Sequence, residues 1–287
     1  MEVKKILVVG AGTMGHGIAQ LAAQQGFEAY LLDTEKTIVD KAYMKIKENL
    51  FKRVEKGKIT KEQAEEVIKR ITVGTELESF SDADFVIEAV FEDIEIKKKV
   101  FEKLDSIFGP EVVLTTNTTA CSISEIAAAT KNRKRVIGMH FFNPPLIMKL
   151  VEIIPGLETD EATVEKTKAM AEMLDKTPIV TKIETPAGIV SRVLAALLNE
   201  AVVVYSEGVA DAKDIDTAMK LGANLPMGPL ELIDMIGVDI HLAKTETLYR
   251  EYSDPRYRPP YILRKMVKAG HLGRKTGRGF YVYDENK

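Results

Sequence analysis

The stretch Lys5-Ile6-Leu7-Val8-Val9-Gly10-Ala11-Gly12-Thr13-Met14-Gly15 decides the fold prediction. A short apolar run leads directly into the pattern G-x-G-x-x-G, and the helical run Ile18–Ala23 follows. In this setting the first glycine permits a tight turn, the second lets the backbone approach a pyrophosphate, and the third lets helix pack on strand. The helix N-terminus then faces the anion. The stretch therefore predicts a dinucleotide site formed by Gly10, Gly12, Thr13, Met14 and Gly15.

The next apolar run, Ala29–Leu32, ends at a carboxylate, Asp33. A carboxylate at this position accepts a hydrogen bond from the ribose 2′-hydroxyl and repels a 2′-phosphate. We therefore expect NAD rather than NADP as the cofactor. Lys36 is the nearest basic residue, and it leaves an NADP pocket open as an alternative.

Further short apolar runs recur in the first 180 residues, at Phe85–Ile87, Val112–Leu114 and Val136–Met139. Longer stretches of helical character, such as Glu92–Phe108, separate them. Apolar strands that alternate with helices predict a mostly parallel sheet covered on both faces. The Lys- and Glu-rich segment Lys36–Arg70 interrupts this rhythm, and we interpret it as a projecting helical pair with a break at Gly57.

The strand pattern stops at Pro186, and four helices are predicted after it. They are Ile189–Val209, Ala212–Leu221, Pro229–Tyr252 and Tyr261–Ala269. The fold class is therefore α/β, with an N-terminal Rossmann-type doubly wound sheet carrying a helical projection and a smaller all-α C-terminal domain. We place the NAD-binding Rossmann domain at residues 1–184 and the helical substrate and dimerisation domain at residues 185–287.

The first of these helices, Ile189–Val209, is apolar on most of its sides. A helix of this kind must be buried all round. A helical unit of about 100 residues is too small to cover all of it. We therefore expect a partner subunit to cover the rest, which makes a homodimer through the C-terminal domain.

Composition excludes several classes of protein. The chain has 287 residues, 45% hydrophobic and 29% charged, with a formal net charge of −3, so we expect no nucleic-acid partner. One cysteine and four histidines form no disulfide and no zinc spacing, so no metal is expected. No apolar run reaches the ~20 residues of a membrane span, so we expect no membrane partner. The strand pattern begins by Val3, so we expect no leader peptide and a cytoplasmic location.

A proton-handling pair is predicted near the middle of the chain. His140 ends the run Val136–Met139, and a second run, Leu150–Ile154, follows the break at Phe141–Pro145. If the two runs pair antiparallel about residue 146, His140 faces Glu152 at a distance that permits a hydrogen bond. A carboxylate that orients an imidazole makes it a good general base. A buried histidine held by a structural glutamate is the alternative.

The other three histidines are predicted to be structural. His16 follows the glycine pattern and fits the first turn of the helix. His241 and His271 fall at surface-like positions in the helical part.

Several motifs together resemble the 3-hydroxyacyl-CoA dehydrogenases, and among them the bacterial 3-hydroxybutyryl-CoA dehydrogenases. The resemblance covers essentially the whole chain, and its most specific parts are His-Phe-Phe-Asn-Pro at residues 140–144 and Pro-Met-Gly-Pro at residues 226–229. Other matching stretches are Gly10–Gly15, Val86–Ala89, Lys149–Glu152, Asp216–Gly222 and Gly273–Tyr281.

The resemblance implies NAD-dependent oxidation of the L-3-hydroxyl of an acyl-CoA to a 3-ketoacyl-CoA, or the reverse. It makes His140 the catalytic base and Glu152 the carboxylate that orients it. It implies an acyl-CoA substrate, contacted by Asn49 and Lys56, and a dimer formed by the C-terminal domain. The residues that it implies in NAD binding are Glu92, Lys97, Asn117, Thr119, Asn143 and Lys275.

Two positions depart from the family pattern. Thr119, in the stretch Thr116–Ala120, replaces a family serine, so it keeps the hydroxyl near the substrate oxygen and adds a methyl. Ser191 stands where the family has an asparagine that holds the substrate, and its hydroxyl is shorter and offers one donor instead of two. Both residues are expected in the catalytic site, with a changed substrate choice or rate.

Two other functions remain as alternatives. One is an NAD-dependent dehydrogenase of the same fold that acts on a non-CoA hydroxy acid. The other is a non-catalytic protein that retains a dinucleotide-binding fold. Lys56 and Asn49 favour CoA over the first, and the His140–Glu152 pair argues against the second.

Overall fold

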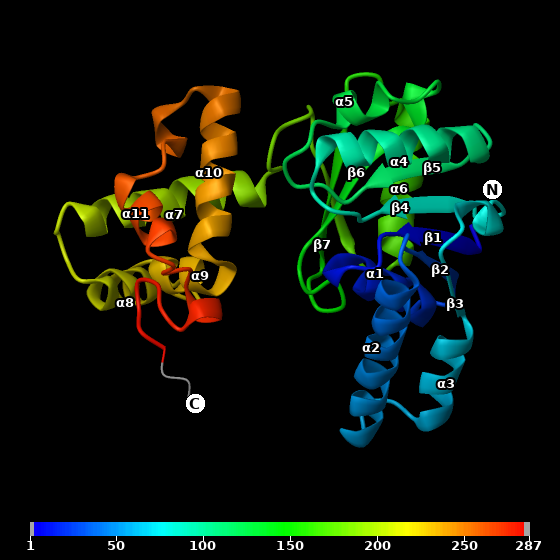
Figure 1. The fold of residues 1–287 in the computed structure, drawn as a ribbon, viewed down its shortest axis with the longest axis horizontal. Helices are drawn as coiled ribbons and strands as arrows, with labels where there is room; N and C mark the ends of the chain where they lie inside the picture. Colours follow the sequence, from blue (N-terminus) through cyan, green and yellow to red (C-terminus); the bar gives the residue numbers. More distant parts are fainter. Residues whose placement is uncertain (1–2, 284–287) are drawn as a thin grey trace. The chain divides into compact units, whose positions relative to one another are not determined.

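The chain divides into two compact units, the first ending at Thr185 and the second beginning at Pro186. The computed structural model describes residues 3–283 (Figure 1).

The first unit is built on one sheet with the strand order β3-β2-β1-β4-β5-β6-β7-β8. The strands β3 to β6 in that order are parallel, β7 is antiparallel to β6, and β8 is parallel to β7. Strand β1 lies between β2 and β4, so the strand order reverses at β1, and in sheets of this kind ligands bind at the carboxyl ends of the strands beside such a reversal. The bounds are β1 Lys5–Val9, β2 Glu28–Leu32, β3 Ile71–Gly74, β4 Phe85–Glu88, β5 Val113–Thr116, β6 Val136–Phe141, β7 Leu150–Pro155 and β8 Thr177–Val180.

Helices cover both faces of this sheet, as the alternation of strands and helices predicts. Ile6 and Val8 of β1 lie in one core, packed with α1 (Thr13–Gln24) and α6 (Glu161–Met173). Leu7 and Val9 lie in the other, packed with α4 (Ile94–Ile107) and α5 (Ile123–Ala127). Successive residues of a strand point to opposite faces, so a strand buried on both sides is apolar throughout.

The predicted helical pair is confirmed as α2 (Lys36–Glu55) and α3 (Lys61–Lys69), which extend away from the sheet (Figure 1). Gly57 lies between them with φ +64°, a left-handed conformation that glycine adopts without a steric cost. Thr60 then starts α3 with a capping box, in which its side chain and that of Gln63 each accept from the other's backbone N–H.

The second unit is helical. Its apolar core includes Leu198, Leu230 and Leu263, each at most 2% exposed. Its helices are α7 Val190–Ser206, α8 Ala212–Gly222, α9 Pro229–Ile236, α10 Val238–Tyr252 and α11 Tyr261–Lys268. Short 3₁₀ turns occur in both units at Leu77–Phe80, Arg133–Arg135, Pro255–Tyr257 and Arg274–Thr276.

Two predictions about the second unit are wrong. The helix expected at Pro229–Tyr252 is two helices, because Gly237 between them has φ +112°, outside the helical region. His241 is not at the surface: it is 2% exposed within α10, and burial lowers its pKa to about 4.

The predicted long apolar helix is α7, and its burial is uneven. Leu198 and Val202 are in the core, whereas Val193 is 62% exposed. The described residues of the chain therefore leave part of α7 uncovered.

Candidate active site

The glycine loop joins β1 to α1 with the geometry that the sequence predicts. Gly10 has φ +102°, and a Cβ on Gly15 would lie 1.7 Å from the Gly10 carbonyl oxygen. Gly12 is the N-cap of α1, no side chain caps that helix end, and a Cβ on Gly12 would meet nothing within 4 Å. The uncapped N–H groups beside open space are suited to an anion such as a pyrophosphate.

Asp33 follows β2 beside this loop. Its Oδ2 accepts a hydrogen bond of 2.8 Å from the Ala11 backbone N–H, and the residue is half-buried. The carboxylate therefore holds the loop and still reaches solvent. His16 occupies the first turn of α1 as predicted, with its Nδ1 2.7 Å from the Gly12 carbonyl oxygen, and burial lowers its pKa.

The predicted proton-handling pair is present. Strands β6 and β7 pair antiparallel with His140 opposite Glu152, and the His140 Nδ1 lies 3.1 Å from the Glu152 Oε2. His140 is 6% exposed and Glu152 is fully buried. The Phe142 ring packs against the imidazole with a centroid distance of 4.6 Å. Because Glu152 accepts at Nδ1, the Nε2 atom is the one turned toward the loop after β5.

That loop brings Thr119 to the imidazole. The Thr119 Oγ1 lies 3.3 Å from the His140 Nε2. Asn117 fixes the neighbouring backbone, since its Oδ1 accepts a 2.8 Å hydrogen bond from the Phe141 N–H. The carboxyl ends of β5 and β6 are thus tied together at the edge of the sheet where β1 ends in the glycine loop.

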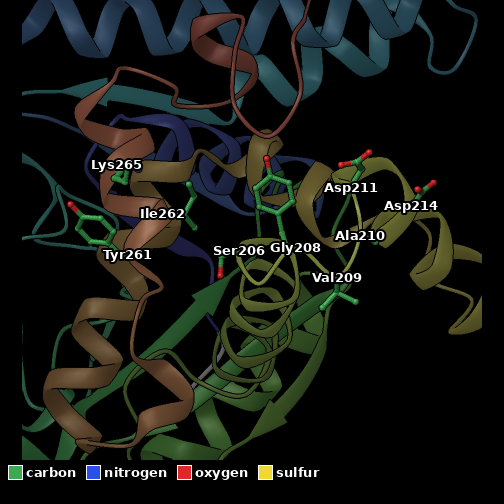
Figure 2. Close-up of a pocket in the computed structure, with 10 residues that line it drawn as sticks. Ser206, Gly208, Val209, Ala210, Asp211, Asp214, Tyr261, Ile262 and Lys265 are labelled. Carbon is green, nitrogen blue, oxygen red and sulfur yellow. The ribbon is translucent and has the colours of Figure 1, made fainter.

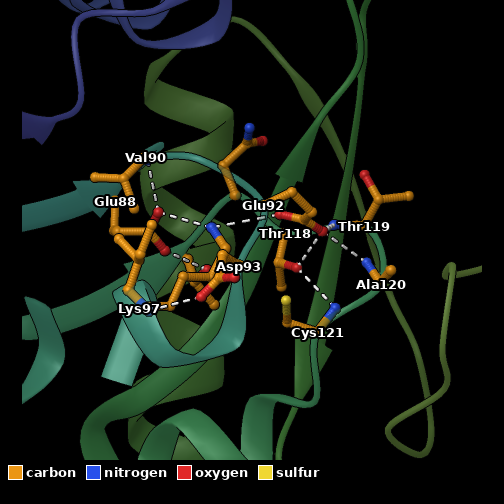
Figure 3. Close-up of polar contacts among 12 residues, drawn as sticks. Glu88, Val90, Glu92, Asp93, Lys97, Thr118, Thr119, Ala120 and Cys121 are labelled. Carbon is orange, nitrogen blue, oxygen red and sulfur yellow. Dashed lines mark hydrogen bonds and ion pairs between the residues drawn. The ribbon is translucent and has the colours of Figure 1, made fainter. Parts of the chain in front are cut away.

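A partly buried network lies beside Thr119, at the start of α4 (Figure 3). The Glu92 Oε1 accepts from the Thr118 hydroxyl at 2.6 Å and from the backbone N–H groups of Thr119 and Ala120 at 2.8 and 2.9 Å. The Lys97 Nζ lies 3.4 Å from the Glu92 Oε2 and 2.7 Å from the Glu88 Oε1. Glu88 and Lys97 are fully buried.

The two carboxylates of this network have opposite pKa shifts. Burial opposes ionisation of Glu92, but the Lys97 charge and the hydrogen bonds from Thr118 and the loop N–H groups lower the pKa of Glu92 below its ordinary value. Burial dominates at Glu88 and raises its pKa, against the charge of Lys97 and the hydrogen bonds. Glu92 is therefore held as an anion that anchors the Thr118–Ala120 backbone.

The remaining predicted residues lie outside β6 and outside the loop after β5. Asn143 is exposed in the loop after β6, Asn49 is half-buried on α2, and Lys56 is exposed as the C-cap of that helix. Ser191 and Lys275 belong to the second unit. Ser191 is 8% exposed at the start of α7, and the Lys275 Nζ lies 2.7 Å from an Asp239 carboxylate oxygen.

Sequence reasoning did not single out Glu88 or Lys176. Lys176 is 7% exposed, and its Nζ donates to the carbonyl oxygens of Pro145 and Met148 at 2.6 and 2.9 Å, which anchors the loop that follows His140. Glu88 carried a usable signal, a carboxylate at the end of an apolar strand. Lys176 carried none, because nothing in its local sequence indicates carbonyl partners from another loop.

Both units match known protein families. Residues 5–184 match the family model described as "3-hydroxyacyl-CoA dehydrogenase, NAD binding domain", and residues 189–283 match "3-hydroxyacyl-CoA dehydrogenase, C-terminal domain". The chain belongs to the 3-hydroxyacyl-CoA dehydrogenase family. The resemblance and the fold class predicted from the sequence are thereby confirmed.

Similar proteins span the same length as this 3-hydroxyacyl-CoA dehydrogenase family member. It is 46% identical, over 99% of both chains, to a Bacillus subtilis protein named "probable 3-hydroxybutyryl-CoA dehydrogenase". It is 44% identical to a Clostridioides difficile 3-hydroxybutyryl-CoA dehydrogenase, over 98% of this chain and all of the other. The crystal structure of (S)-3-hydroxybutyryl-CoA dehydrogenase from Ralstonia eutropha matches with a TM-score of 0.96 and 42% identity, over 99% of this chain and 100% of that one.

Within residues 3–283, no group of three or more His, Cys, Asp or Glu side chains is arranged to hold a metal ion. Over the same residues, no helix has the length and apolar character needed to cross a membrane.

The second unit of this family member also contains an open pocket of about 830 Å³ at the end of α7 (Figure 2). Its lining includes Tyr205, Val209, Asp211, Tyr261 and Lys265. None of the predicted site residues lines it.

Proposed function

We propose that this chain catalyses the reversible oxidation of an L-3-hydroxyacyl-CoA to a 3-ketoacyl-CoA with NAD, and that its substrate is short, such as 3-hydroxybutyryl-CoA. The observation that carries the proposal is the His140–Glu152 pair at the sheet edge of the glycine loop, with the His140 Nε2 3.3 Å from the Thr119 hydroxyl. Relatives named 3-hydroxybutyryl-CoA dehydrogenases that match over nearly the whole chain support it.

The chain's own groups manage the proton in this reaction, and NAD, when bound, supplies the hydride acceptor. His140 takes the hydroxyl proton at Nε2, because its Nδ1 is engaged by Glu152. The buried carboxylate of Glu152 stabilises the imidazolium that forms. In the reverse direction the imidazolium returns the proton to the oxygen. Thr119 contributes a hydroxyl beside the same oxygen.

The first unit fits NAD through its uncapped helix end and the open space at Gly12. We assign the pyrophosphate to residues 10–15 and the adenosine ribose to Asp33. The other residues predicted to bind NAD are Glu92, Lys97, Asn117, Thr119, Asn143 and Lys275. Since Lys97 has no exposed surface, its part is to hold Glu92 rather than to meet the cofactor directly.

For the substrate, we assign Asn49 and Lys56 of α2 to the CoA portion and Thr119 and Ser191 to the acyl portion. The domains follow the same division: residues 1–184 bind NAD, and residues 185–287 contribute to the substrate site and to dimerisation. The exposed apolar side chains of the second unit support a homodimer, with Val193, Val209 and Tyr261 at 62%, 67% and 72% exposure. We place the enzyme in the cytoplasm.

The direct test measures NADH oxidation by the purified chain with acetoacetyl-CoA, in parallel with acetoacetate and other keto acids that lack CoA. Turnover of acetoacetyl-CoA alone supports the proposal. Turnover of a free keto acid in its place identifies the non-CoA dehydrogenase. NADH binding without turnover of any compound would indicate a non-catalytic dinucleotide-binding protein.

We expect the enzyme to prefer NADH over NADPH. The Asp33 carboxylate stands beside the loop, where it would repel a 2′-phosphate. Measuring kcat/KM with each cofactor at saturating acetoacetyl-CoA tests this. Equal values, or a higher value with NADPH, would mean that Lys36 or another cation controls the pocket.

We expect Lys56→Ala to raise the KM for acetoacetyl-CoA and to leave kcat nearly unchanged. Lys56 is exposed at the end of α2, and a contact with a CoA phosphate would be the same in the ground and transition states. The effect should weaken with added salt and vanish with acetoacetyl-pantetheine, which lacks the nucleotide phosphates.

The matched control for this prediction is Lys41→Ala, which removes the same charge from the other end of α2, where Lys41 is also exposed. It should leave the KM unchanged. If Lys56→Ala raised the KM for acetoacetyl-CoA and for acetoacetyl-pantetheine equally, a contact between Lys56 and the CoA nucleotide would be excluded.

A further inference from the structure

We propose that Glu88 is a positioning residue that acts on catalysis through Lys97 and Glu92 by keeping the Thr119 hydroxyl against His140. This inference rests on the proposed function, because it concerns the same catalytic site. Glu88 itself touches neither His140 nor open space: it is fully buried at the end of β4 (Figure 3).

The carboxylate of Glu88 is bound on both oxygens. Its Oε1 accepts from the Val90 N–H and from the Lys97 Nζ, both at 2.7 Å, and its Oε2 accepts from the Thr116 hydroxyl at 2.6 Å. A carboxylate with no exposed surface is retained at a cost in desolvation, which three donors, one of them the Lys97 cation, offset in part. Its three partners come from the ends of β4 and β5 and from α4.

The next step is Lys97, whose ammonium lies between two carboxylates. It is 2.7 Å from Glu88 and 3.4 Å from Glu92, and it has no exposed surface. A buried ammonium requires a counter-charge. With Glu88 present, the shorter contact meets that requirement, and Glu92 is left to serve the loop.

The last step concerns the two carboxylate oxygens of Glu92, which have different partners. Its Oε1 receives the Thr118 hydroxyl and the N–H groups of Thr119 and Ala120, while its Oε2 faces Lys97. If Glu88 loses its charge, Lys97 has Glu92 as its remaining carboxylate in this network. The ammonium then draws the Glu92 carboxylate toward itself, and the hydrogen bonds that set the Thr119 position weaken.

The first test is Glu88→Gln, which keeps the size of the side chain and removes its charge. We expect kcat with acetoacetyl-CoA to fall about tenfold or more, since small displacements of positioned groups are costly, and the Kd for NADH to change by less than about twofold. The penalty on kcat should disappear when Glu88→Gln is added to Thr119→Val, because the two changes act through one contact. Additive losses would overturn the proposal.

A second readout does not depend on activity. Cys121, the only cysteine of the chain, donates its backbone N–H to the Thr118 Oγ1 at 2.9 Å within the same loop and is half-buried. Glu88→Gln should therefore speed the reaction of the Cys121 thiol with a disulfide reagent several-fold, well below the melting temperature. An unchanged rate of Cys121 modification would overturn the proposal about Glu88. Failure of the wild-type protein to turn over acetoacetyl-CoA would contradict only the proposed function, because the Cys121 measurement does not require turnover.

The matched control is Asp105→Asn, which disrupts another ion pair of the first unit, between Asp105 and Arg135 at 2.8 Å, with both side chains at most 6% exposed. It should lower the melting temperature without changing kcat or the Cys121 rate. The double variant Glu88→Gln, Lys97→Met removes the unpaired buried charge, so it should fold even if Glu88→Gln alone does not. Its kcat should exceed that of Glu88→Gln, because no ammonium remains to draw the Glu92 carboxylate away from the loop; a kcat no higher than that of Glu88→Gln would overturn the proposal.

Discussion

Replacing His140 with glutamine is expected to lower kcat by about 10²–10⁴-fold, the usual contribution of a positioned general acid–base group, and to leave NADH binding unchanged. Glutamine retains hydrogen-bonding capacity toward Glu152 but cannot accept and return a proton. Since the glycine loop belongs to β1 and α1, cofactor binding does not depend on the imidazole. Stopped-flow turnover and fluorescence titration of NADH measure the two quantities separately.

Two further variants test this prediction. Glu152→Gln should also reduce kcat, because an amide does not stabilise imidazolium as a buried carboxylate does. His271→Gln, in the second unit, should turn over normally and serves as the control. Near-normal turnover by His140→Gln would end the proposed mechanism.

Replacing Gly15 with alanine is expected to destabilise the first unit by about 3 kcal/mol or more, a large effect for one methyl group. The added Cβ would stand 1.7 Å from the Gly10 carbonyl oxygen, and backbone cannot swing aside as a flexible side chain can. The clash lies where α1 packs on the loop after β1. Thermal unfolding should show a melting temperature lower by about 6 °C or more.

Gly12→Ala separates the effect on folding from the effect on binding. Gly12 has φ −67°, which alanine adopts readily, and its Cβ would meet no protein atom within 4 Å. This variant should melt like the wild type and yet bind NADH more weakly, because the methyl fills the space assigned to the pyrophosphate. Normal NADH affinity in Gly12→Ala would move the pyrophosphate away from this loop.

Much of the fold could be predicted because local patterns and tertiary structure agree. The glycine loop, the projecting pair around Gly57 and the His140–Glu152 register each depend on neighbours close in sequence. The register in particular was inferred from a short loop, centred on residue 146, between two apolar runs.

The features that escaped prediction depend on distant contacts or on single backbone angles. Strands β3 and β8 are four-residue edge strands, and β8 contains Pro178, which weakens its strand signal. The break at Gly237 is a change in φ within an otherwise continuous helical pattern. The network around Glu88 joins residues of β4, β5 and α4 that no spacing rule brings together.

The uncapped N-terminus of α1 makes the stability of the folded enzyme depend on the concentration of its cofactor. No side chain caps this helix, and its first turn carries no acidic residue. A ligand that binds only the native state adds RT ln(1 + [L]/Kd) to stability, about 2.7 kcal/mol at a hundredfold excess over Kd. If NAD occupies this helix end, a cell depleted of the cofactor would hold a larger unfolded fraction of the enzyme and expose it to proteases. The amount of enzyme would then follow the supply of its own oxidant.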